Sequence, residues 1–199
     1  MKHVNLVVKT GVLFYMKLLI ASDIHGSILY AETLFERVAD EKPDKILLLG
    51  DLLYHGPRND LPDGYNPKAV IALLNAHRER LLCVRGNCEA EVDQMVLAFP
   101  VMAEYACLSI DGVTIFATHG HHANEDNPPP LNAGDILLCG HTHIPAMRAH
   151  ENFTYLNPGS ISLPKAGSAR SYMTLYKGRF ELKTLADGKT IESLDAREK

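Results

Sequence analysis

The chain has 199 residues, a formal net charge of -4 at pH 7, and 46% hydrophobic and 22% charged residues. This composition indicates one folded domain and excludes bulk disorder. The slightly acidic balance lacks the basic excess that holds a polyanion by counterion release, so we expect no charge-driven binding of nucleic acid.

The cysteines and the apolar stretches indicate in which cellular compartment the protein is expected. Four cysteines occur singly, without a Cys-x-x-Cys pair, so free thiols in a reducing cytoplasm are expected. No apolar stretch approaches the ~20 residues that span a bilayer, and residues 1–15 lack the apolar block and cleavage site of a signal peptide. We predict an N-terminal appendage over 1–15, a single domain over 16–185, a C-terminal tail over 186–199 and no membrane association.

The first part of the chain predicts a βαβ unit. Residues 17–21 and 45–49 are short apolar runs typical of buried strands, and the segment 31–40 between them has helical periodicity. Residues 45–49 are apolar on both faces, which favours a parallel strand covered on both sides.

A second helix and strand follow. The helix is expected over 67–77, because Asn66 can cap its first turn and Pro67 suits the first helical position. Residues 81–85 predict the next strand. The alternation of strands and helices predicts an α/β fold.

The later part of the chain predicts antiparallel pairing. Residues 105–110 and 113–118 flank Asp111-Gly112, a dipeptide that favours the turn of a β-hairpin. Segments 54–66 and 121–130 are rich in Pro, Asn, Asp or Gly and are interpreted as loops over a site. Five further strands are expected over 135–139, 147–150, 154–156, 172–176 and 180–185.

Five of the predicted strands are each followed by side chains that commonly bind metals. In open α/β folds, ligands bind at the carboxyl ends of the strands, so these side chains are expected to converge there. The seven residues are Asp23, His25, Asp51, Asn87, His119, His141 and His143.

The ligand types indicate the chemistry. Imidazoles, carboxylates and one amide, without a thiolate, suit Mn²⁺, Fe or Zn²⁺. Seven ligands are too many for one tetrahedral ion, whereas two ions ~3.5–4 Å apart would use them all and clamp the attacking and leaving oxygens of a phosphoryl group. Asp51, which follows a central strand, is the expected bridge between the ions.

Taken singly, these residues have ordinary structural explanations. Asp23 could cap the helix that follows, Asn87 could belong to a turn, and His119 could be a hydrogen-bonded histidine. The pair His141 and His143 is more specific, because an i, i+2 spacing needs extended or looped backbone to bring both rings to one site. Taken together, the ordinary explanations would need unrelated reasons for all seven positions.

Five sequence blocks also carry a resemblance to a known family. They are Asp23-Ile-His25, Gly50-Asp51-x4-Gly56, Gly86-Asn87-Cys88-Glu89, His119-Gly120-His121 and Gly140-His141-Thr142-His143. In order, spacing and glycines they resemble the signature of the calcineurin-like metallophosphoesterases, over essentially residues 16–185. The small size, the loop 157–160 and the lack of a cap domain are most similar to the YfcE-type bacterial phosphodiesterases of that superfamily.

The resemblance implies a fold, a reaction and a set of ligands. The fold would be a four-layer α-β-β-α sandwich of mixed sheets flanked by helices, and a hydroxide bridging two divalent ions would attack the phosphorus of a phosphodiester in line. Mn²⁺ is the favoured ion, with Zn²⁺ and Fe as alternatives. One ion would be held by Asp23, His25, Asp51 and His143, and the other by Asp51, Asn87, His119 and His141.

Cys88 departs from the family pattern, in which many members have a histidine that protonates the leaving oxygen. A thiol is a poorer acid than an imidazolium near neutral pH, which favours diesters with good leaving groups over alkyl monoesters. The alternative is a thiol that only packs beside the site. The expected catalytic residues are Asn87, Cys88, Arg85 and His121. Arg85 could neutralise a substrate oxygen or form a surface ion pair.

Two other functions are weighed against a two-metal phosphodiesterase. A protein-binding scaffold of the same fold, such as the retromer subunit, is disfavoured because all seven ligand positions hold competent ligands. A phosphomonoesterase is disfavoured by Cys88. The expected partner is a small-molecule phosphodiester, and a homo-oligomer is left open.

Overall fold

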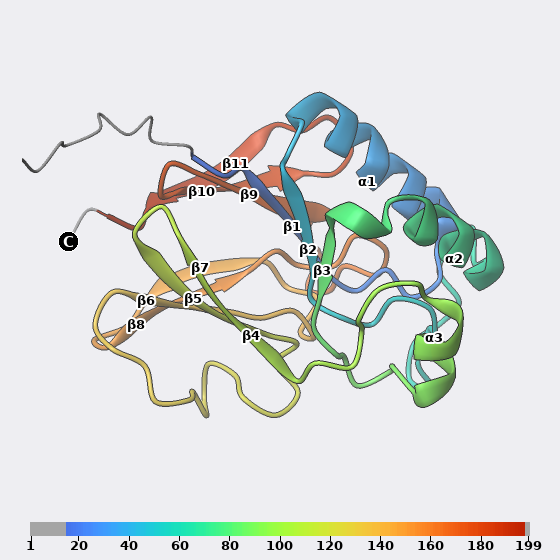
Figure 1. Cartoon of the computed structure of the whole chain (residues 1–199), viewed down its shortest axis with the longest axis horizontal. Coiled ribbons are helices and arrows are strands. Elements are labelled where there is room, and N and C mark those ends of the chain that lie inside the picture. The colour runs from blue at the N-terminus through green and yellow to red at the C-terminus, as the bar shows by residue number, and fades with distance from the viewer. Residues whose placement is uncertain (1–14, 198–199) are drawn as a thin grey trace, which may run out of the picture.

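The computed structural model describes residues 15–197, and these form two β-sheets packed face to face, with helices outside one of them (Figure 1). The strand order is β11-β10-β9-β1-β2-β3 in the six-stranded sheet and β4-β5-β6-β8-β7 in the five-stranded sheet. Each sheet mixes parallel and antiparallel neighbours. The predicted α/β class with two mixed sheets is confirmed.

The elements of the first sheet and its helices follow the predicted order, with one short helix, a 3-10 turn and the last strand in addition. The strands are β1 (Leu18–Ala21), β2 (Lys45–Leu48), β3 (Leu81–Cys83), β9 (Ser171–Tyr176), β10 (Arg179–Thr184) and β11 (Thr190–Asp195). The helices are α1 (Ile28–Glu41), α2 (Pro67–Ala76), α3 (Glu91–Val96) and a 3-10 turn, η1 (Arg78–Arg80).

The predicted βαβ unit is confirmed, because β1 and β2 pair in parallel on either side of α1. Helix α1 begins three residues before the predicted segment, since the Ser27 side chain accepts a hydrogen bond from the backbone N–H of Tyr30 and caps the first turn. Asp23 is therefore free of the capping role that was its ordinary alternative. The cap of α2 is as predicted: the Asn66 side chain accepts from the N–H of Ala69 at 3.2 Å.

Alternation along β1 divides the core into two layers. Leu19 and Ala21 pack toward α1 and α2, whereas Leu18 and Ile20 pack toward the five-stranded sheet. All four side chains are fully buried, as expected for a central strand covered on both faces. The strand ends that follow β1 and β2 are thus held by packing on both sides.

The second sheet contains the predicted hairpin and three further strands. The pairing of β4 and β5 through Asp111 and Gly112 is confirmed, with φ values of 54° and 82° at the two turn residues. The strands are β4 (Tyr105–Ile110), β5 (Val113–Thr118), β6 (Asp135–Leu138), β7 (Ala146–Ala149) and β8 (Phe153–Asn157).

The outer layer over the second sheet differs from the helical layer that the family resemblance implies. Within residues 15–197 no helix packs there, and the connection between β5 and β6 runs along the outside of the sheet (Figure 1). Leu131 of this connection packs against the cluster that contains Leu137 and Tyr155. A loop therefore supplies the fourth layer.

The two ends of the chain were assigned outside the fold. Residues 1–14 of the predicted appendage lie outside the described residues, and Tyr15 is exposed beside Tyr176, with ring centroids 6.4 Å apart. Within the predicted tail, β11 pairs antiparallel with β10 and extends the sheet. The boundary of the single domain stays a prediction.

A partly buried ion cluster joins the end of α1 to the sheet. Glu41 accepts from the ammonium groups of Lys17, at 2.5 Å, and of Lys183, and from the Tyr172 hydroxyl at 3.1 Å. Burial alone would raise the pKa of the Glu41 carboxyl, but the two lysines outweigh this effect and hold that pKa below its usual value.

None of the helices between residues 15 and 197 combines the length and the apolar character that a bilayer crossing requires.

Candidate metal centre

The loops after β1, β2, β3, β5 and β6 bring the seven predicted ligands to one edge of the sandwich, as the strand-end argument expects. Several of these loops hold non-glycine residues at positive φ, a sparsely populated conformation that recurs at functional sites. The ligands concerned, with φ between 48° and 65°, are Asp23, His25, Asp51, His141 and His143.

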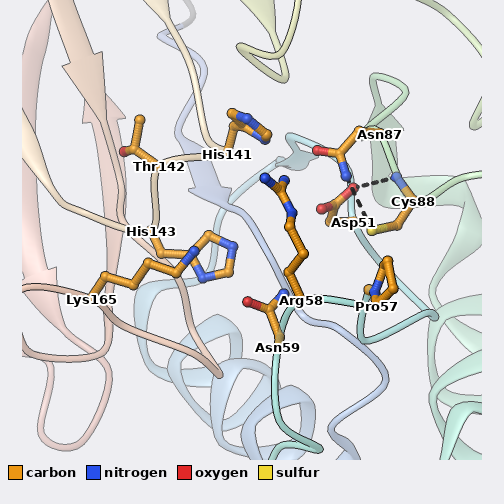
Figure 2. A pocket seen from close by; sticks show the side chains of 11 residues that line it. Asp51, Pro57, Arg58, Asn59, Asn87, Cys88, His141, Thr142, His143 and Lys165 are labelled. Atoms are coloured by element: carbon orange, nitrogen blue, oxygen red, sulfur yellow. Dashed lines mark hydrogen bonds between the residues drawn. The ribbon is translucent and has the colours of Figure 1, made fainter.

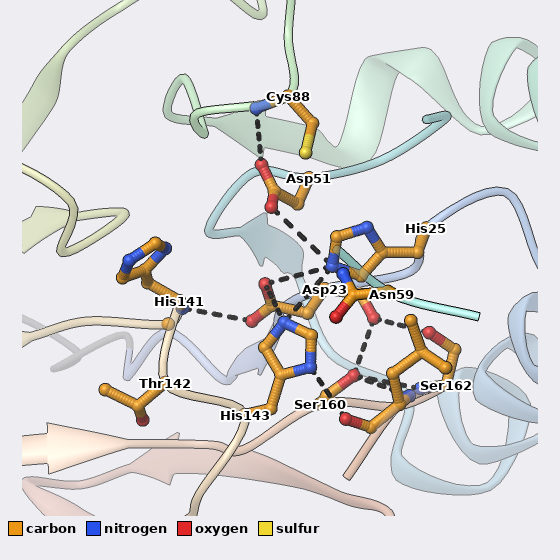
Figure 3. Close-up of polar contacts among 12 residues, drawn as sticks. Asp23, His25, Asp51, Asn59, Cys88, His141, Thr142, His143, Ser160 and Ser162 are labelled. Carbon is orange, nitrogen blue, oxygen red and sulfur yellow. Dashed lines mark hydrogen bonds and ion pairs between the residues drawn. The ribbon is translucent and has the colours of Figure 1, made fainter. Parts of the chain in front are cut away.

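One group of ligand atoms surrounds Asp23, which is completely buried (Figure 3). Its Oδ1 lies 3.3 Å from His143 Nε2 and 3.6 Å from His25 Nε2, and the two imidazole nitrogens are 3.2 Å apart. Asp23 Oδ1 has no hydrogen-bond partner in this environment. A buried, orphaned carboxylate oxygen facing two imidazole nitrogens is the arrangement that a cation would complete.

A second group surrounds His119. Its Nε2 lies 3.1 Å from Asn87 Oδ1, 3.2 Å from His141 Nδ1 and 3.5 Å from Asp51 Oδ2. Asn87 is exposed and His141 half-buried, whereas the ligands around Asp23 are nearly inaccessible. The two groups therefore differ in their access to solvent.

Asp51 lies between the two groups. Its Oδ2 is 3.6 Å from His25 Nε2 in the first group and 3.5 Å from His119 Nε2 in the second. Its other oxygen, Oδ1, accepts the backbone N–H of Cys88 at 2.9 Å, which fixes the orientation of the carboxylate. One oxygen of Asp51 thus faces both ligand groups.

Three of the histidines are oriented by backbone carbonyls. The Nδ1 atoms of His25, His119 and His143 lie 2.8, 2.6 and 2.6 Å from the carbonyl oxygens of Tyr54, Leu49 and Leu163. Because a carbonyl only accepts, Nδ1 carries the proton and Nε2 keeps its lone pair for a metal. The donor set therefore fits divalent ions that prefer nitrogen and oxygen ligands.

The charges of the cluster are strongly coupled. Burial alone would raise the pKa of Asp23, but the adjacent imidazoles of His143 and His25 hold it well below its usual value. Burial opposes protonation of His119, but Asp51 and Asp23 raise its pKa to about 9. Both carboxylates favour positive charge at this point, which in a metal site is the charge of the ion.

Glu89, which has no role in the sequence analysis beyond its place in the third block, anchors the Asp51 loop from behind. The buried carboxylate accepts three backbone N–H groups, from Asp51 at 2.9 Å, Leu52 at 2.7 Å and Gly86 at 2.5 Å. It thereby joins the loops after β2 and β3, which carry Asp51 and Asn87. The signal for this role was the position of Glu89 in the motif, since no local pattern encodes partners so far away in sequence.

Two serines and an asparagine hold the other loops. The hydroxyls of Ser160 and Ser162 both donate to the backbone carbonyl of Asp23 at 2.8 Å, and Asn157 Nδ2 donates to the Gly140 carbonyl at 2.7 Å. Asn157 therefore supports the Gly140 loop, while Ser160 supports Asp23.

The remaining expected catalytic residues lie at different distances from the cluster. Cys88 is half-buried beside Asp51; burial and then the Asp51 charge raise its pKa, so it stays a thiol. The guanidinium of Arg85 is engaged by other groups: it contacts Glu104 at 3.3 Å and the Glu89 carbonyl at 3.4 Å. Its position matches the surface ion pair that was its alternative interpretation.

His121 lies on the outer side of His119, with ring centroids 5.4 Å apart. Burial, with His119 next, lowers its pKa to about 4, so the ring is neutral near pH 7. It can offer ligand atoms together with Glu104 and His122, all within 4.8 Å of one another, beside the seven-residue cluster.

A cavity of about 440 Å³ opens above the cluster (Figure 2). Its walls include Asp51, Asn87, Cys88, His141 and His143, so members of both ligand groups face its interior. Three further polar residues of the wall were not predicted from sequence: Arg58, Asn59 and Lys165. The only sequence signal for Arg58 and Asn59 was the loop 54–66, which was expected to cover a site, and Lys165 had no such signal.

Comparison with known proteins shows which family the chain belongs to. The family model for the calcineurin-like phosphoesterase superfamily domain matches residues 16–177. Phosphodiesterase YfcE of Escherichia coli strain K12 is 45% identical over 157 residues, which cover 79% of this chain and 85% of that protein. The proteins of this name from strains CFT073 and O157:H7 match equally well.

Solved structures agree. The structure of YfcE, a phosphoesterase from E. coli, superimposes with a TM-score of 0.89 at 41% identity, and the match covers 92% of this chain and 100% of that one. A Vps29 variant from Entamoeba histolytica shares the fold alone, at 20% identity and a TM-score of 0.61, covering 90% of this chain and 99% of its own. With a family match over most of its length and a relative at 45% identity, the chain belongs to the calcineurin-like phosphoesterase superfamily.

Proposed function

We propose that this protein is a metal-dependent phosphodiesterase that uses two divalent ions. The observation that carries the proposal is the position of Asp51 Oδ2, 3.6 and 3.5 Å from imidazole nitrogens of two separate ligand groups. A carboxylate oxygen that faces two nitrogen groups is suited to bridge a pair of ions. The name of the relative, phosphodiesterase YfcE, supports the same reaction class.

The proposed ligand sets follow the two groups. Asp23, His25, Asp51 and His143 would hold the first ion, with the orphaned Asp23 Oδ1 as one donor. The second ion would be held by Asp51, Asn87, His119 and His141 at the mouth of the cavity. Nitrogen and oxygen ligands suit Mn²⁺, which we favour, and also Zn²⁺ or Fe.

When bound, such ions polarise a phosphoryl oxygen and lower the pKa of water, so that a nucleophile is available near neutral pH. The protein residues supply orientation. Glu89 and the Cys88 backbone N–H fix Asp51, and the Leu49 carbonyl fixes the ring of His119. A substrate phosphate is thereby placed against residues whose positions are set before it binds.

Cys88 adjoins the place where the leaving group would depart. Its raised pKa makes the thiol a weak proton donor, so the protein favours leaving groups that depart without a proton. A diester with an aryl or otherwise activated alcohol meets this condition, and an alkyl monoester does not. This is the basis for proposing a diesterase over a monoesterase.

The test uses chelator-treated protein to which Mn²⁺, Zn²⁺ or Fe²⁺ is restored, assayed on bis-p-nitrophenyl phosphate and p-nitrophenyl phosphate. We expect hydrolysis of the diester to return with the metal and to exceed hydrolysis of the monoester. Asp51→Asn should abolish turnover and lower the metal content, whereas Asp60→Asn, the same change at an exposed position in the following loop, should leave both unaltered.

Two outcomes would contradict the proposal. Absence of turnover with every ion would favour the scaffold function, and full activity of Asp51→Asn with two bound ions would remove the bridge. The ions should also leave in order during dialysis against chelator: the ion at Asn87 and His141 first, because those ligands are the more accessible.

A further inference from the structure

Two cations border the cavity and have no partner within the described part of the chain. Arg58 and Lys165 line the same cavity as the proposed ligands Asp51, His141 and His143. Among residues 15–197, neither side chain makes a hydrogen bond or an ion pair. The guanidinium of Arg58 extends toward the space between His141 and Asp51 (Figure 2).

The backbone around Arg58 is compact. Asn59 Nδ2 donates to the His55 carbonyl at 2.8 Å, and the Asn59 N–H donates to the Gly56 carbonyl at 3.3 Å. A side chain at Gly56, where φ is 81°, would come within 3.4 Å of Cys88 Sγ. This turn packs against the cysteine beside Asp51 and so presents Arg58 to the cavity.

The cavity wall has polar and charged groups, and its aromatic rings are the imidazoles of the proposed ligands His141 and His143. Within the described part of the chain, its lining contains no Phe, Tyr or Trp, so stacking on a nucleobase is not available there. A cavity of about 440 Å³ is in the range of small-molecule sites. Recognition in this cavity therefore rests on charge and hydrogen bonds.

The charge available exceeds what a simple diester needs. A phosphodiester carries one negative charge, which the two proposed ions would already face. Arg58 and Lys165 add two further cations beyond the ligands, and a guanidinium forms bidentate hydrogen bonds with phosphate or carboxylate oxygens. A second anionic group on the substrate would use them.

We infer that the substrate is a compact phosphodiester that carries a second anionic group, a phosphate or a carboxylate, bound by Arg58 and Lys165. This inference rests on the proposed phosphodiesterase function. Both residues are exposed and unpartnered, so they can be replaced without loss of internal contacts.

The test compares three p-nitrophenyl diesters that differ only beyond the phosphate: ethyl, carboxyethyl and phosphonoethyl p-nitrophenyl phosphate. We expect kcat/KM to be about tenfold higher for a doubly anionic substrate than for the ethyl ester, a difference that added salt reduces. The two anionic substrates also separate a carboxylate from a phosphate as the natural group.

Substitutions then assign the preference to residues. Arg58→Gln and Lys165→Gln should each remove most of the preference, through KM, and leave the ethyl ester nearly unaffected. Arg58→Lys should restore part of it. Arg78→Gln is the matched control, because Arg78 is exposed in η1, before β3 and thus at the opposite edge of the sheet.

Three results would overturn the inference: equal rates of the parent protein on the three diesters, an equal loss on all three in Arg58→Gln, or the same loss in Arg78→Gln. Failure of the proposed function is recognised separately by absence of turnover of the ethyl ester. In that case, calorimetry can still compare the affinities of the protein for phosphonopropionate and for propylphosphonate. Equal affinities would refute binding of the second anionic group by Arg58 and Lys165.

Discussion

Replacement of Glu89 by glutamine tests whether one buried carboxylate holds the two central loops of the site together. The carboxylate accepts three backbone N–H groups from both sides. An amide can keep its oxygen toward Asp51 and Gly86, but its NH₂ group then faces the N–H of Leu52. That donor loses an acceptor in a buried environment.

The expected loss follows from this count. One buried unsatisfied donor costs about 1–3 kcal/mol, so we expect Glu89→Gln to lower the free energy of unfolding by about 2 kcal/mol. For a protein of this length, that corresponds to a Tm lower by about 4–8 °C. Metal affinity should fall as well, because the backbone of Asp51 loses its anchor.

The measurement is urea and thermal unfolding after chelator treatment, so that metal binding does not mask the change. Glu91→Gln is the control, because Glu91 is exposed on α3 and its replacement should stay within ~0.5 kcal/mol. If Glu89→Gln were as stable as Glu91→Gln, the three hydrogen bonds would not stabilise the loops, and the anchoring role would be refuted.

Three further predictions address other parts of the chain. The pKa of Glu41 is lowered in the folded protein, so the ionised carboxylate stabilises the fold fully above the unfolded-state pKa, and this stabilisation is lost as pH falls through the folded-state pKa. Glu41→Gln should therefore lower the free energy of unfolding at neutral pH, measured in urea, and the difference from the parent protein should shrink below about pH 4. Cys88→Ser should hardly change hydrolysis of aryl diesters, whereas Cys88→His should raise rates on poorer leaving groups by at most about 10²–10⁴-fold; a rate ratio independent of leaving-group pKa would mean that the imidazole delivers no proton. Gly50→Ala should lower the free energy of unfolding by more than about 2 kcal/mol, because φ at Gly50 is 93° and the new Cβ would lie 2.4 Å from the Gly86 nitrogen. Gly167→Ala, where φ is 71° and the Cβ would meet open space, is the control for backbone strain alone. Equal losses in the two variants would contradict the steric argument.

Local sequence signals predicted those parts of the fold whose cause is local. The hairpin turn at Asp111 and Gly112 and the cap at Asn66 depend on neighbours in sequence, and both are confirmed. Helix α3 and strand β11 were missed. The six residues of α3 are too few to establish a period, and β11 lacks buried alternation because it lies at the edge of its sheet.

The candidate site divides in the same way. The seven ligands could be proposed because strand ends meet at one edge, and the structure brings them together. The roles of Glu89 and Arg58 could not be proposed, because they depend on which loops pack side by side. Glu89 meets Leu52, which is 37 positions away, and nothing in either segment encodes that contact.

The hydrogen bonds to the Asp23 carbonyl have a consequence for folding during synthesis. Its carbonyl is held by hydroxyls that lie 137 and 139 positions later in the chain, and β1 is completed on one side only by β9. A ribosome therefore exposes the first two ligands long before their supports exist, at about 5–20 residues per second. The nascent N-terminal half has carboxylate and imidazole groups but no rigid cage for an ion. We expect metal acquisition to follow release of the whole domain, so that the supply of the ion acts on the finished protein and not on its folding intermediate.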